Sequence, residues 1–425
     1  MFLLNSEHLK FYKLIISSDS EEKFFKSVRN FSKKLLVNLI EDFYELIQDF
    51  EQNSESSEKI QVFPNTLLRR LNLLISQTCN LGCVYCYGAK GSYDKESLMT
   101  EKIAAKTLEV FTKLYIGIQD VNFFGGEPLL NLRLIEYVLK WFSTRLGEQP
   151  SYVIVTSLAV PPRVVEELTG LISRYKECNI VVTVSIDGPP EIHNLTRPFK
   201  NGYSSFNLID ENIKKLRYIN QPKAFEVTYT KLHQDLNVKP EDIIDFLVKR
   251  YHLTHERIFI VPVVSTDPKI AVQDTCLSSF GIWNRLFKLR KCDPYIKEQI
   301  QQIFDRITNS KPNTYFCDAG ISNFTVTASG EIYPCQMLVG KDGFKIGTVY
   351  ENIGTLKEKM RHKHFEYARI FSKHYKECED CFMEYLCSQC TAGNYISTGQ
   401  WISFDECVQK RNFVTQVLRS YLDRI

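Results

Sequence analysis

Short apolar segments rich in β-branched and aromatic residues recur along the middle of the chain, and longer segments with helical spacing of apolar residues lie between them. The apolar segments are residues 71–76, 121–126, 151–157, 181–187, 225–230 and 257–263, and the amphipathic ones are 100–115, 132–146, 162–175, 207–219 and 240–251. Strands that are apolar on both faces and alternate with helices indicate parallel β–α–β units. The pattern therefore predicts an α/β fold, a barrel-like or open parallel sheet, with functional residues at the carboxyl ends of the strands.

The pattern changes toward both ends of the chain. Residues 1–50 show helical spacing, and the polar segment 51–61 is typical of a linker. After about residue 313 the sequence is loop-rich and dense in cysteine, so we expect metal centres to stabilise it. We predict a short N-terminal helical segment (1–65), a core (66–265), a helical connector (266–312), a cysteine-rich domain (313–412) and a C-terminal helix (413–425).

Bulk composition narrows the expected partners and location. The formal net charge is only +3 over 425 residues, so we do not expect nucleic acid as a partner. No segment approaches the roughly 20 apolar residues of a membrane-spanning helix. The first residues mix charged with apolar side chains, unlike a signal peptide. We therefore expect a cytoplasmic protein without membrane attachment.

The chain has 13 cysteines, which disulfides explain poorly in a reducing compartment. Closely spaced cysteines in such a chain indicate metal or redox chemistry. Most fall into two groups: Cys79, Cys83 and Cys86, and then Cys317, Cys335, Cys378, Cys381, Cys387, Cys390 and Cys407. Cys178, Cys276 and Cys292 stand apart, and we expect them to be small buried hydrophobic residues.

The first group lies in the loop that follows the first expected strand. Cys79, Cys83 and Cys86 have the spacing C-x3-C-x2-C, and thiolates favour zinc, copper(I) or iron–sulfur clusters. A structural zinc ion normally takes four ligands, often from paired C-x2-C arms. Three cysteines fit better a [4Fe–4S] cluster with one iron left open. A three-cysteine zinc site with a remote fourth ligand is the alternative.

The C-x3-C-x-aromatic-C pattern, with Tyr85 as the aromatic residue, resembles the signature of the radical S-adenosylmethionine (SAM) superfamily. The resemblance implies a partial (β/α)6 TIM-like barrel. It implies that Cys79, Cys83 and Cys86 are catalytic and hold a [4Fe–4S] cluster, whose fourth iron binds the amino and carboxylate groups of SAM beside Tyr85. In that family SAM is cleaved to a 5′-deoxyadenosyl radical, which abstracts hydrogen from the substrate.

A Gly-Gly-Glu sequence at the end of the second expected strand resembles a SAM-binding motif of the same family. The resemblance implies that Gly125, Gly126 and Glu127 bind the SAM ammonium group, since glycines allow close approach of the backbone. Relatives often have Thr-Asn-Gly after the third strand, where this chain has Thr156, Ser157 and Leu158. Ser157 can still hydrogen-bond SAM, but the contact of an asparagine amide is lost.

The fourth expected strand and the residues after it resemble the family's Ser-x-Asp-Gly…His…Arg segment. By this resemblance Ser185 and Asp187 lie near the SAM ribose and carboxylate, and Arg197 pairs with the methionyl carboxylate through its planar fork. The alternative for Arg197 is a surface salt bridge. His193 is assigned no role, because a loop histidine is more often structural than catalytic.

The second cysteine group resembles the SPASM domain, an extension of radical SAM enzymes that act on peptides and proteins. The spacing from Cys317 to Cys335 fits that domain, and a C-x2-C-x5-C run begins at Cys378. The match fails after Cys387, because two residues rather than three precede Cys390.

The SPASM resemblance implies two auxiliary [4Fe–4S] clusters. The expected ligands are Cys378, Cys381, Cys387 and Cys407 for one cluster, and Cys317, Cys335 and Cys390 for the other. The latter lacks a fourth ligand, which Cys276, Cys292, a non-cysteine side chain or a substrate thiolate would supply. A pair of structural zinc ions is the alternative.

Radical SAM enzymes with SPASM domains mostly modify ribosomally made peptides or proteins. Those that mature sulfatases typically have an aspartate base after the Tyr-Pro-Cys cysteine, whereas this chain has Gln336, an amide that cannot accept a proton as a carboxylate does. The surrounding sequence resembles maturases of cysteine-rich peptides. We therefore expect a maturase that installs thioether crosslinks between a cysteine sulfur and a carbon.

The expected partners are a cysteine-containing, ribosomally synthesised precursor peptide and an electron donor such as flavodoxin or ferredoxin. Residues 1–65 are either a helical cap on the barrel or a degenerate peptide-recognition region. Three alternatives remain open: carbon–carbon crosslinking, formylglycine formation in sulfatases, and a zinc-stabilised binding protein without activity.

Overall fold

The computed structural model describes residues 67–145, 149–219, 221–252, 257–272, 282, 315–379, 381–383 and 387–422. All of them belong to one compact unit, Asn65–Ile425. The expected helical segment 1–65, most of the connector 266–312, and both Cys276 and Cys292 lie outside the described residues.

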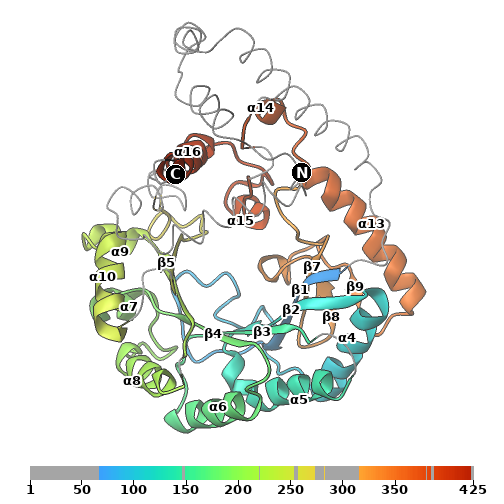
Figure 1. The fold of residues 1–425 in the computed structure, drawn as a ribbon, viewed down its shortest axis with the longest axis horizontal. Helices are drawn as coiled ribbons and strands as arrows, with labels where there is room; N and C mark the ends of the chain where they lie inside the picture. Colours follow the sequence, from blue (N-terminus) through green and yellow to red (C-terminus); the bar gives the residue numbers. More distant parts are fainter. Residues whose placement is uncertain are drawn as a thin grey trace, which may run out of the picture. The chain divides into compact units, whose positions relative to one another are not determined.

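Six parallel strands form the centre of the unit and confirm the predicted α/β fold (Figure 1). They are β1 (Leu67–Ser76), β2 (Gly117–Gly125), β3 (Ser151–Thr156), β4 (Ile180–Ser185), β5 (Ala224–Tyr229) and β6 (Ile258–Pro262), hydrogen-bonded in the order β6-β5-β4-β3-β2-β1. This order is that of a partial (β/α)6 barrel. Its carboxyl-terminal strand ends lie at one edge, where the expected site residues follow the strands.

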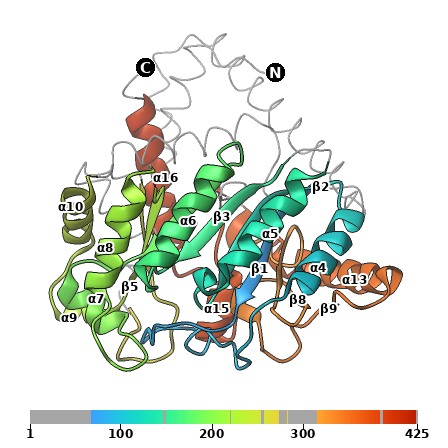
Figure 2. The same cartoon turned by 90° about the horizontal axis from the view of Figure 1, so that it is seen from below.

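Helices cover the outer face of the curved sheet. The five predicted helices are α4 (Glu101–Leu114), α5 (Leu132–Ser143), α6 (Pro162–Arg174), α8 (Phe206–Arg217) and α10 (Pro240–Tyr251). Helices α4, α5, α6 and α8 lie side by side over the sheet (Figure 2). Three short elements were not predicted, namely η3 (Pro128–Asn131), α7 (Pro190–Thr196) and α9 (Lys231–Asp235).

Successive side chains of each strand point to opposite faces of the sheet, one toward the helices and one toward the inside of the barrel. On the outer face, Tyr152 of β3 contacts Phe142 of α5, with ring centres 6.1 Å apart. On the inner face, the Asn122 amide of β2 donates to Asn72 of β1 over 3.0 Å. The outer face of β3 therefore buries hydrocarbon under α5, while β1 and β2 place a hydrogen-bonded amide pair inside the barrel.

The cysteine-rich region continues the same sheet. Strand β7 (Asn323–Val326) pairs in parallel with β1, and β8 (Glu331–Tyr333) and β9 (Gly347–Thr348) follow antiparallel. The Asn72 amide donates to the Asn323 side chain over 2.7 Å, across this junction. The first strand of the cysteine-rich region thus completes the edge of the barrel.

Helices are more prominent in the cysteine-rich region than its sequence indicated. The elements after β8 that are not strands are η6 (Gln336–Leu338), α13 (Ile353–Phe371), α14 (Lys376–Glu379), α15 (Thr391–Thr398) and α16 (Cys407–Leu422). Helix α13 is 19 residues long and was not predicted, because it is highly charged and buries only a narrow stripe. Helix α16 begins at Cys407 rather than at residue 413.

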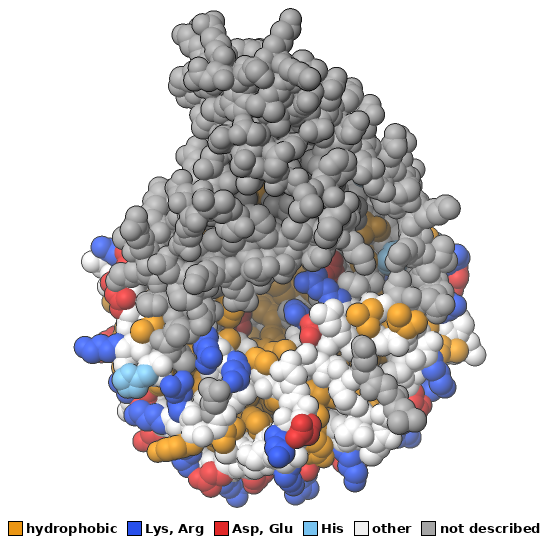
Figure 3. Space-filling model, in the orientation of Figure 1, with side chains coloured by type: hydrophobic (Ala, Val, Ile, Leu, Met, Phe, Trp, Pro, Cys, Tyr) orange, Lys and Arg blue, Asp and Glu red, His pale blue; other side chains and the backbone are white. Residues whose placement is uncertain are grey.

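Hydrophobic side chains of described residues gather near the centre of the face shown in Figure 3, and acidic and basic side chains mix around its rim. No described helix combines the length and the apolar character that crossing a bilayer requires.

Candidate functional site

The loop that follows β1 is anchored by the buried side chain of Gln77. Its amide donates to the carbonyl groups of Ser92 and Lys95 over 3.2 and 3.3 Å, and its oxygen accepts from the Ala328 N–H over 2.8 Å. A backbone hydrogen bond from Gln77 N to Ser97 O closes the loop. The expected cluster-binding cysteines therefore lie on a loop that is fixed at both ends.

A second segment runs beside the loop and brings Arg197 to it. Backbone hydrogen bonds join Gly82 N to Pro198 O over 2.8 Å and Val84 N to Thr196 O over 3.0 Å. As a result, Nη1 of Arg197 lies 4.0 Å from Sγ of Cys83. Cys83 and Arg197, which are 114 positions apart in the sequence, are thus neighbours in the fold.

The three cysteines of the first group lie close enough to influence one another. Burial, with the nearby Glu127 carboxylate and the thiols of Cys83 and Cys86, raises the pKa of Cys79 to about 12. Burial also raises the pKa of Cys83 to about 11, against the lowering effect of Arg197. Thiols that resist ionisation become thiolates when they bind a metal, whose positive charge offsets the desolvation.

The distribution of possible metal-ligating side chains can be compared with the alternative of a zinc ion at the first cysteine group. Across the described ranges, no three Cys, His, Asp or Glu side chains converge as ligands of a single metal ion. A cubane cluster places iron and sulfide between its cysteines, so its thiolates lie farther apart than the ligands of one zinc ion. Three thiols on one loop are also the number of protein ligands that a [4Fe–4S] cluster with one open iron takes.

The two glycines after β2 allow two backbone segments to touch. Gly125 has φ of +131°, and a Cβ atom there would lie 2.1 Å from the Ser76 carbonyl oxygen. A Cβ atom on Gly126 would lie 2.2 Å from the Thr78 oxygen. The glycines thus bring the turn against the start of the cysteine loop, a close approach to the chain's own backbone.

Glu127 is fully buried, and its carboxylate accepts four hydrogen bonds. Oε1 accepts from Thr156 Oγ1 over 2.6 Å and from Leu129 N over 3.1 Å. Oε2 accepts from the backbone and hydroxyl of Ser157 over 2.9 and 2.6 Å. Burial raises the pKa of Glu127 although these hydrogen bonds lower it.

No Lys or Arg of the described part of the chain forms an ion pair with Glu127. A buried carboxylate without a cation is expensive, so this position fits the ammonium group of SAM. Ser157 already donates its hydroxyl to Glu127 and accepts from Ala159 N over 3.2 Å. Its place in the site is therefore to orient Glu127.

Leu158 stands where relatives often have glycine, and the structure shows why glycine suits that position. Leu158 has φ of +60° and is fully buried. Its carbonyl accepts from the Asn212 amide over 3.0 Å, and its N–H donates to Thr156 Oγ1 over 2.9 Å. The surrounding hydrogen bonds hold a leucine in a left-handed conformation that disfavours it.

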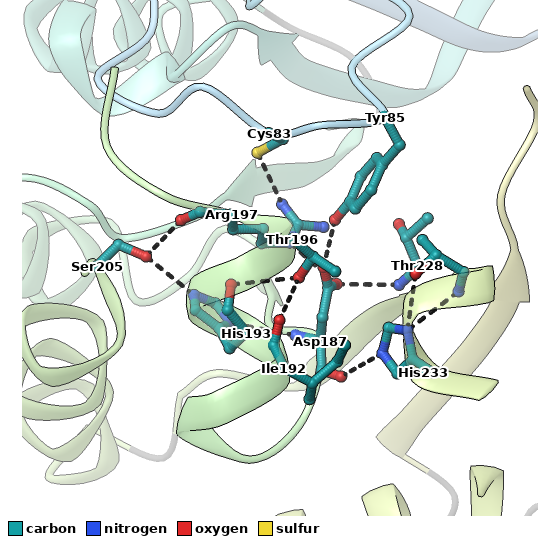
Figure 4. A network of polar contacts seen from close by, with 11 residues as sticks. Cys83, Tyr85, Asp187, Ile192, His193, Thr196, Arg197, Ser205, Thr228 and His233 are labelled. Carbon is teal, nitrogen blue, oxygen red and sulfur yellow. Dashed lines mark hydrogen bonds and ion pairs between the residues drawn. The ribbon is translucent and has the colours of Figure 1, made fainter. Parts of the chain in front are cut away.

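Asp187 and Arg197 form a buried ion pair, with Nε of Arg197 3.0 Å from Oδ1 of Asp187 (Figure 4). The hydroxyl of Tyr85 donates to Oδ2 of Asp187 over 2.6 Å, and Thr228 N donates to Oδ1 over 3.1 Å. Burial is the largest single influence and raises the pKa of Asp187, but Arg197 together with the neighbouring groups, including the Tyr85 hydroxyl, lowers it below its usual value. Arg197 is therefore not a surface residue, and Asp187 fixes its guanidinium beside the cysteine loop.

Two buried histidines hold the backbone of Asp187, and sequence reasoning gave neither a role. Nδ1 of His193 accepts from Asp187 N over 3.2 Å, and Nε2 lies 3.1 Å from Ser205 Oγ (Figure 4). Because Ser205 donates to the Arg197 carbonyl, His193 carries its proton on Nε2. Nε2 of His233 donates to the Asp187 carbonyl over 2.9 Å. Burial lowers the pKa of His193 to about 4, so it is neutral near pH 7.

Ser185 ends β4 and pairs in register with Glu226 of β5. Glu226 was not identified from the sequence, although an acidic residue inside an apolar strand segment is a detectable signal. Burial raises the pKa of Glu226, while Arg197 lowers it. Ser185 therefore lies at the end of β4, and its partner Glu226, within β5, lies near the Asp187–Arg197 pair.

The second cysteine group separates into two neighbourhoods. Burial raises the pKa of Cys335 to about 12, and the next neighbours that influence it include the thiols of Cys317 and Cys390. Cys390 Sγ lies 3.8 Å from the thioether of Met337. Cys335 belongs to one apolar cluster that includes Tyr367, Cys317 packs against that cluster, and Cys390 contacts Met337 at its edge.

The other neighbourhood contains Cys378, Cys381, Cys387 and Cys407. Cys378 and Cys387 belong to a cluster with Phe316, and Cys381 N donates to Cys378 O over 3.0 Å. Burial raises the pKa of Cys387, and Cys407 and Cys381 add to the rise. The division of the cysteines between the two neighbourhoods is the one that the SPASM resemblance implies.

Of the three cysteines outside the two groups, the structure describes Cys178, and its burial differs from the expectation. Cys178 is only partly buried, because it lies in the turn between α6 and β4 rather than under a helix. The expectation of a buried hydrophobic residue was therefore wrong for Cys178.

Residues 73–247 match the family description of the radical SAM superfamily. These residues form a radical SAM domain. The domain extends from β1 to α10 and contains the first cysteine group, Glu127 and the Asp187–Arg197 pair. The residues that form the candidate site therefore all lie within the radical SAM domain.

Two of the three relatives described here match a longer part of the chain than residues 73–247. An uncharacterized protein of Methanocaldococcus jannaschii is 28% identical over 279 residues, which are 64% of this chain and 86% of that protein. The radical SAM cyclopropyl synthase TigE of Paramaledivibacter caminithermalis is 30% identical over 34% of this chain, and that match spans only 33% of TigE. The cysteine-type anaerobic sulfatase-maturating enzyme of Clostridium novyi is 25% identical over 67% of this chain and 78% of that enzyme.

Two solved structures share the fold. That of anSMEcpe with bound AdoMet and the Cp18Cys peptide has a TM-score of 0.65 at 16% identity, covering 85% of this chain and 100% of that chain. Streptococcus suis SuiB bound to precursor peptide SuiA has a TM-score of 0.52 at 16% identity, covering 94% and 92%. At these identities the likeness concerns the fold, including the radical SAM barrel.

The expected cofactors are confirmed at the level of the domain. They are a [4Fe–4S] cluster and SAM at the radical SAM site. The anSMEcpe structure likewise contains bound AdoMet.

Proposed function

We propose that this chain is a radical SAM peptide maturase that installs thioether crosslinks in a ribosomally synthesised precursor peptide. The observation that carries the proposal is the placement of Cys83 beside the buried Asp187–Arg197 pair. Cys79 of the same loop lies near Glu127, a carboxylate that no described Lys or Arg pairs with. Together they offer a cluster, a carboxylate and a guanidinium for the two charged groups of the methionyl part of SAM.

Each residue of the first site takes a defined part in this proposal. Cys79, Cys83 and Cys86 hold the cluster, and Glu127 binds the SAM ammonium group, for which its desolvated carboxylate is suited. Arg197, oriented through Nε by Asp187, presents its remaining nitrogens to the SAM carboxylate. When bound, the cluster and SAM supply the 5′-deoxyadenosyl radical that abstracts a hydrogen atom from the peptide.

The remaining predicted SAM contacts complete the site. The guanidinium carbon of Arg197 lies over the Tyr85 ring, 5.3 Å from the ring centre. Ser157 orients Glu127, the turn at Gly125 and Gly126 forms the wall of the site, and Ser185 faces the ribose.

The cysteine-rich region is proposed to be a SPASM domain with two auxiliary clusters. Its ligands are Cys378, Cys381, Cys387 and Cys407 for one cluster, and Cys317, Cys335 and Cys390 for the other. The open position of the three-cysteine cluster suits a thiolate of the peptide. Each thioether removes two hydrogens from the peptide, one as an atom and one as a proton and an electron, and an auxiliary cluster supplies the electron acceptor.

Formylglycine formation is the second candidate, because the relative from Clostridium novyi is named a sulfatase-maturating enzyme. The residue Gln336 is evidence against formylglycine formation. This residue begins η6 directly after Cys335, and its amide cannot serve as the base that sulfatase maturases have after the equivalent cysteine.

The proposed partners follow from the chemistry. The precursor peptide contains cysteine, and an electron donor such as flavodoxin or ferredoxin reduces the enzyme. We also propose that the protein acts in the cytoplasm, where iron–sulfur clusters persist in a reducing environment.

The test is anaerobic reconstitution with iron, sulfide, SAM and a reductant. The wild-type chain is expected to hold about ten to twelve irons, and a Cys79→Ala, Cys83→Ala, Cys86→Ala variant about four fewer. That variant should release no 5′-deoxyadenosine. Wild-type protein that contains zinc and no iron would contradict the assignment to an enzyme.

The substrate class is tested with two peptides. A cysteine-containing peptide encoded beside the enzyme's gene should become lighter by two hydrogens per crosslink and lose thiols. A sulfatase-derived cysteine peptide should remain unchanged. Conversion of the sulfatase peptide to formylglycine would favour the second candidate instead, and 5′-deoxyadenosine release with both peptides unchanged would overturn both.

A further inference from the structure

Strand β5 carries a carboxylate on the inner face of the barrel. Phe225 and Val227 are fully buried under the helices, and the Phe225 ring stacks on Tyr251 of α10 with ring centres 5.3 Å apart. Glu226 alternates with them along the strand, so its side chain points to the opposite face, into the barrel. Glu226 is only partly buried, so packing does not close the inner face of β5 at this position.

The strand pairing places Glu226 beside the ion pair of Asp187 and Arg197. Glu226 lies opposite Ser185, the last residue of β4. Two residues farther along the same face of β5, Thr228 N donates to Oδ1 of Asp187 over 3.1 Å (Figure 4). Glu226 is therefore two residues from the position at which β5 holds the ion pair.

The three carboxylates of this region differ in how their oxygens are used. The carboxylate of Glu127 accepts four hydrogen bonds. That of Asp187 accepts three. Glu226 forms no side-chain hydrogen bond or ion pair with any residue of the described part of the chain. Of these three carboxylates, that of Glu226 is available to a substrate inside the barrel.

Tyr87 links this carboxylate with the cysteine-rich region. It follows Cys86 in the cysteine loop, and its ring lies edge-on to that of Tyr93, with ring centres 6.3 Å apart. Burial raises the pKa of Tyr87, and Tyr93, Glu226 and Cys335 add to the rise. The Tyr87 hydroxyl is therefore within electrostatic range of both Glu226 and Cys335, so this part of the barrel adjoins the three-cysteine neighbourhood.

Thioether formation needs a group that accepts a proton. A cysteine thiol has a pKa of about 8.5, so it is mostly protonated near pH 7. Gln336 follows Cys335, and its amide cannot accept the proton. Burial raises the pKa of Glu226, with a further rise from Asp187 and an opposing effect from Arg197. A carboxylate with a raised pKa is a stronger base toward a thiol.

We propose that Glu226 is a catalytic residue of thioether formation and accepts the proton of the peptide's cysteine thiol. The inference rests on the proposed function. The S–H bond breaks, the proton passes to a carboxylate oxygen of Glu226, and the electron pair stays on the sulfur. The partner carbon of the peptide loses a hydrogen atom to the 5′-deoxyadenosyl radical, the carbon–sulfur bond forms, and the remaining electron reduces an auxiliary [4Fe–4S] cluster.

The test uses the reconstituted full-length chain with SAM, a reductant and the cysteine-containing peptide encoded beside its gene. Glu226→Gln keeps the shape of the side chain and removes the proton acceptor, so crosslinking at pH 7 should fall at least about 100-fold. Iron content, peptide affinity and 5′-deoxyadenosine release should remain as in the wild-type chain. Glu226→Asp, which keeps a carboxylate, should crosslink faster than Glu226→Gln.

Two measurements separate proton transfer from a structural role. The crosslinking rate of Glu226→Gln should rise about tenfold per pH unit up to about pH 8.5, because the thiol then ionises unaided, whereas the wild-type rate should rise less. A peptide with selenocysteine in place of cysteine, whose selenol is already ionised near pH 7, should restore crosslinking by Glu226→Gln. Glu191→Gln is the matched control, because Glu191 is exposed at the start of α7, and it should crosslink as the wild-type chain does.

The possible outcomes separate this inference from the proposed function. Crosslinking by Glu226→Gln at the wild-type rate, or no rescue by the selenocysteine peptide, would overturn the inference alone. Loss of 5′-deoxyadenosine release together with crosslinking would place Glu226 at SAM and overturn it as well. Release of 5′-deoxyadenosine by the wild-type chain without any crosslink would contradict the proposed function, and the inference with it.

Discussion

Asp187 organises the candidate site through both its side chain and its backbone. Its carboxylate binds Arg197 and Tyr85, while its N–H and carbonyl are held by His193 and His233. The residue therefore links the guanidinium beside Cys83 to two buried imidazoles, and its contacts lead to two predictions.

Replacing Asp187 with asparagine should leave the Arg197 guanidinium buried without its counter-charge. Breaking a buried ion pair in this way lowers the free energy of unfolding by about 3 kcal/mol. Urea unfolding of the apo chain measures it. The exposed pair of Lys231 and Asp235 is the control, since Asp235→Asn should change stability by less than about 0.5 kcal/mol. Equal effects of both variants would show that Arg197 has another acceptor.

Stability should fall in mild acid because of His193. Burial lowers its pKa to about 4, below the unfolded value of 6.5, so the unfolded chain binds the proton first. The contribution is complete above the unfolded pKa and is lost as pH falls toward the folded pKa, by about 2 kcal/mol between about pH 7 and about pH 5.

The variant His193→Gln should show a smaller loss over that interval. His374→Gln, at an exposed position, should behave as the wild-type chain does. Urea unfolding at the two pH values compares the three chains, and parallel slopes for His193→Gln and the wild type would refute the assignment to His193.

The residue types and their spacing in the sequence predicted many residues of the candidate site, but not the contacts among them. The cysteine spacing and the Gly-Gly-Glu sequence indicated which side chains gather after β1 and β2. The pairing of Asp187 with Arg197 could not be foreseen, because it depends on the backbone hydrogen bonds between the cysteine loop and residues 196–200. The roles of His193 and His233 likewise appear only when Asp187 has been placed.

At the scale of elements, the turn after β2 is restricted by its contact with the cysteine loop. A Cβ atom on Gly126 would lie 2.2 Å from Thr78 O, so Gly126→Ala must displace backbone. We expect a loss of about 1–3 kcal/mol in unfolding free energy and less iron at the first cluster. Urea unfolding and iron analysis after reconstitution measure both.

Gly170→Ala is the matched control for this glycine. Gly170 lies exposed in α6, and a Cβ atom there meets nothing within 4 Å. Alanine favours a helix interior, so this variant should be more stable by about 0.5–1 kcal/mol. Destabilisation by Gly170→Ala would mean that the conformational argument is wrong for this helix.

Elements were predictable where their hydrophobic period was strong. The six parallel strands and five long helices lie within a few residues of their predicted ends. Helix α13 was missed because Leu356, Met360 and Phe371 are buried among many charged residues. Strand β7 was missed because four residues carry no readable period.

At the scale of the whole molecule, β7 closes an edge that the barrel would otherwise expose. Strand β1 lies between β2 and β7, so a chain that ends at residue 312 should present β1 as a bare edge strand. Such edges pair with other chains, and we expect the truncated chain to aggregate. Size-exclusion chromatography and hydrogen exchange at β1 test this, with a chain ending at residue 422 as the control. A monomeric truncated chain with protected β1 amides would contradict it.

The contact between Gln77 and Ala328 has a consequence for biosynthesis. These residues are 251 positions apart, yet Ala328 N–H is one of the groups that fixes the start of the cysteine loop. During translation β7 and Ala328 must leave the ribosome before that hydrogen bond can form. Iron–sulfur delivery to Cys79, Cys83 and Cys86 should therefore follow chain completion, and stalled nascent chains should remain without metal at this loop.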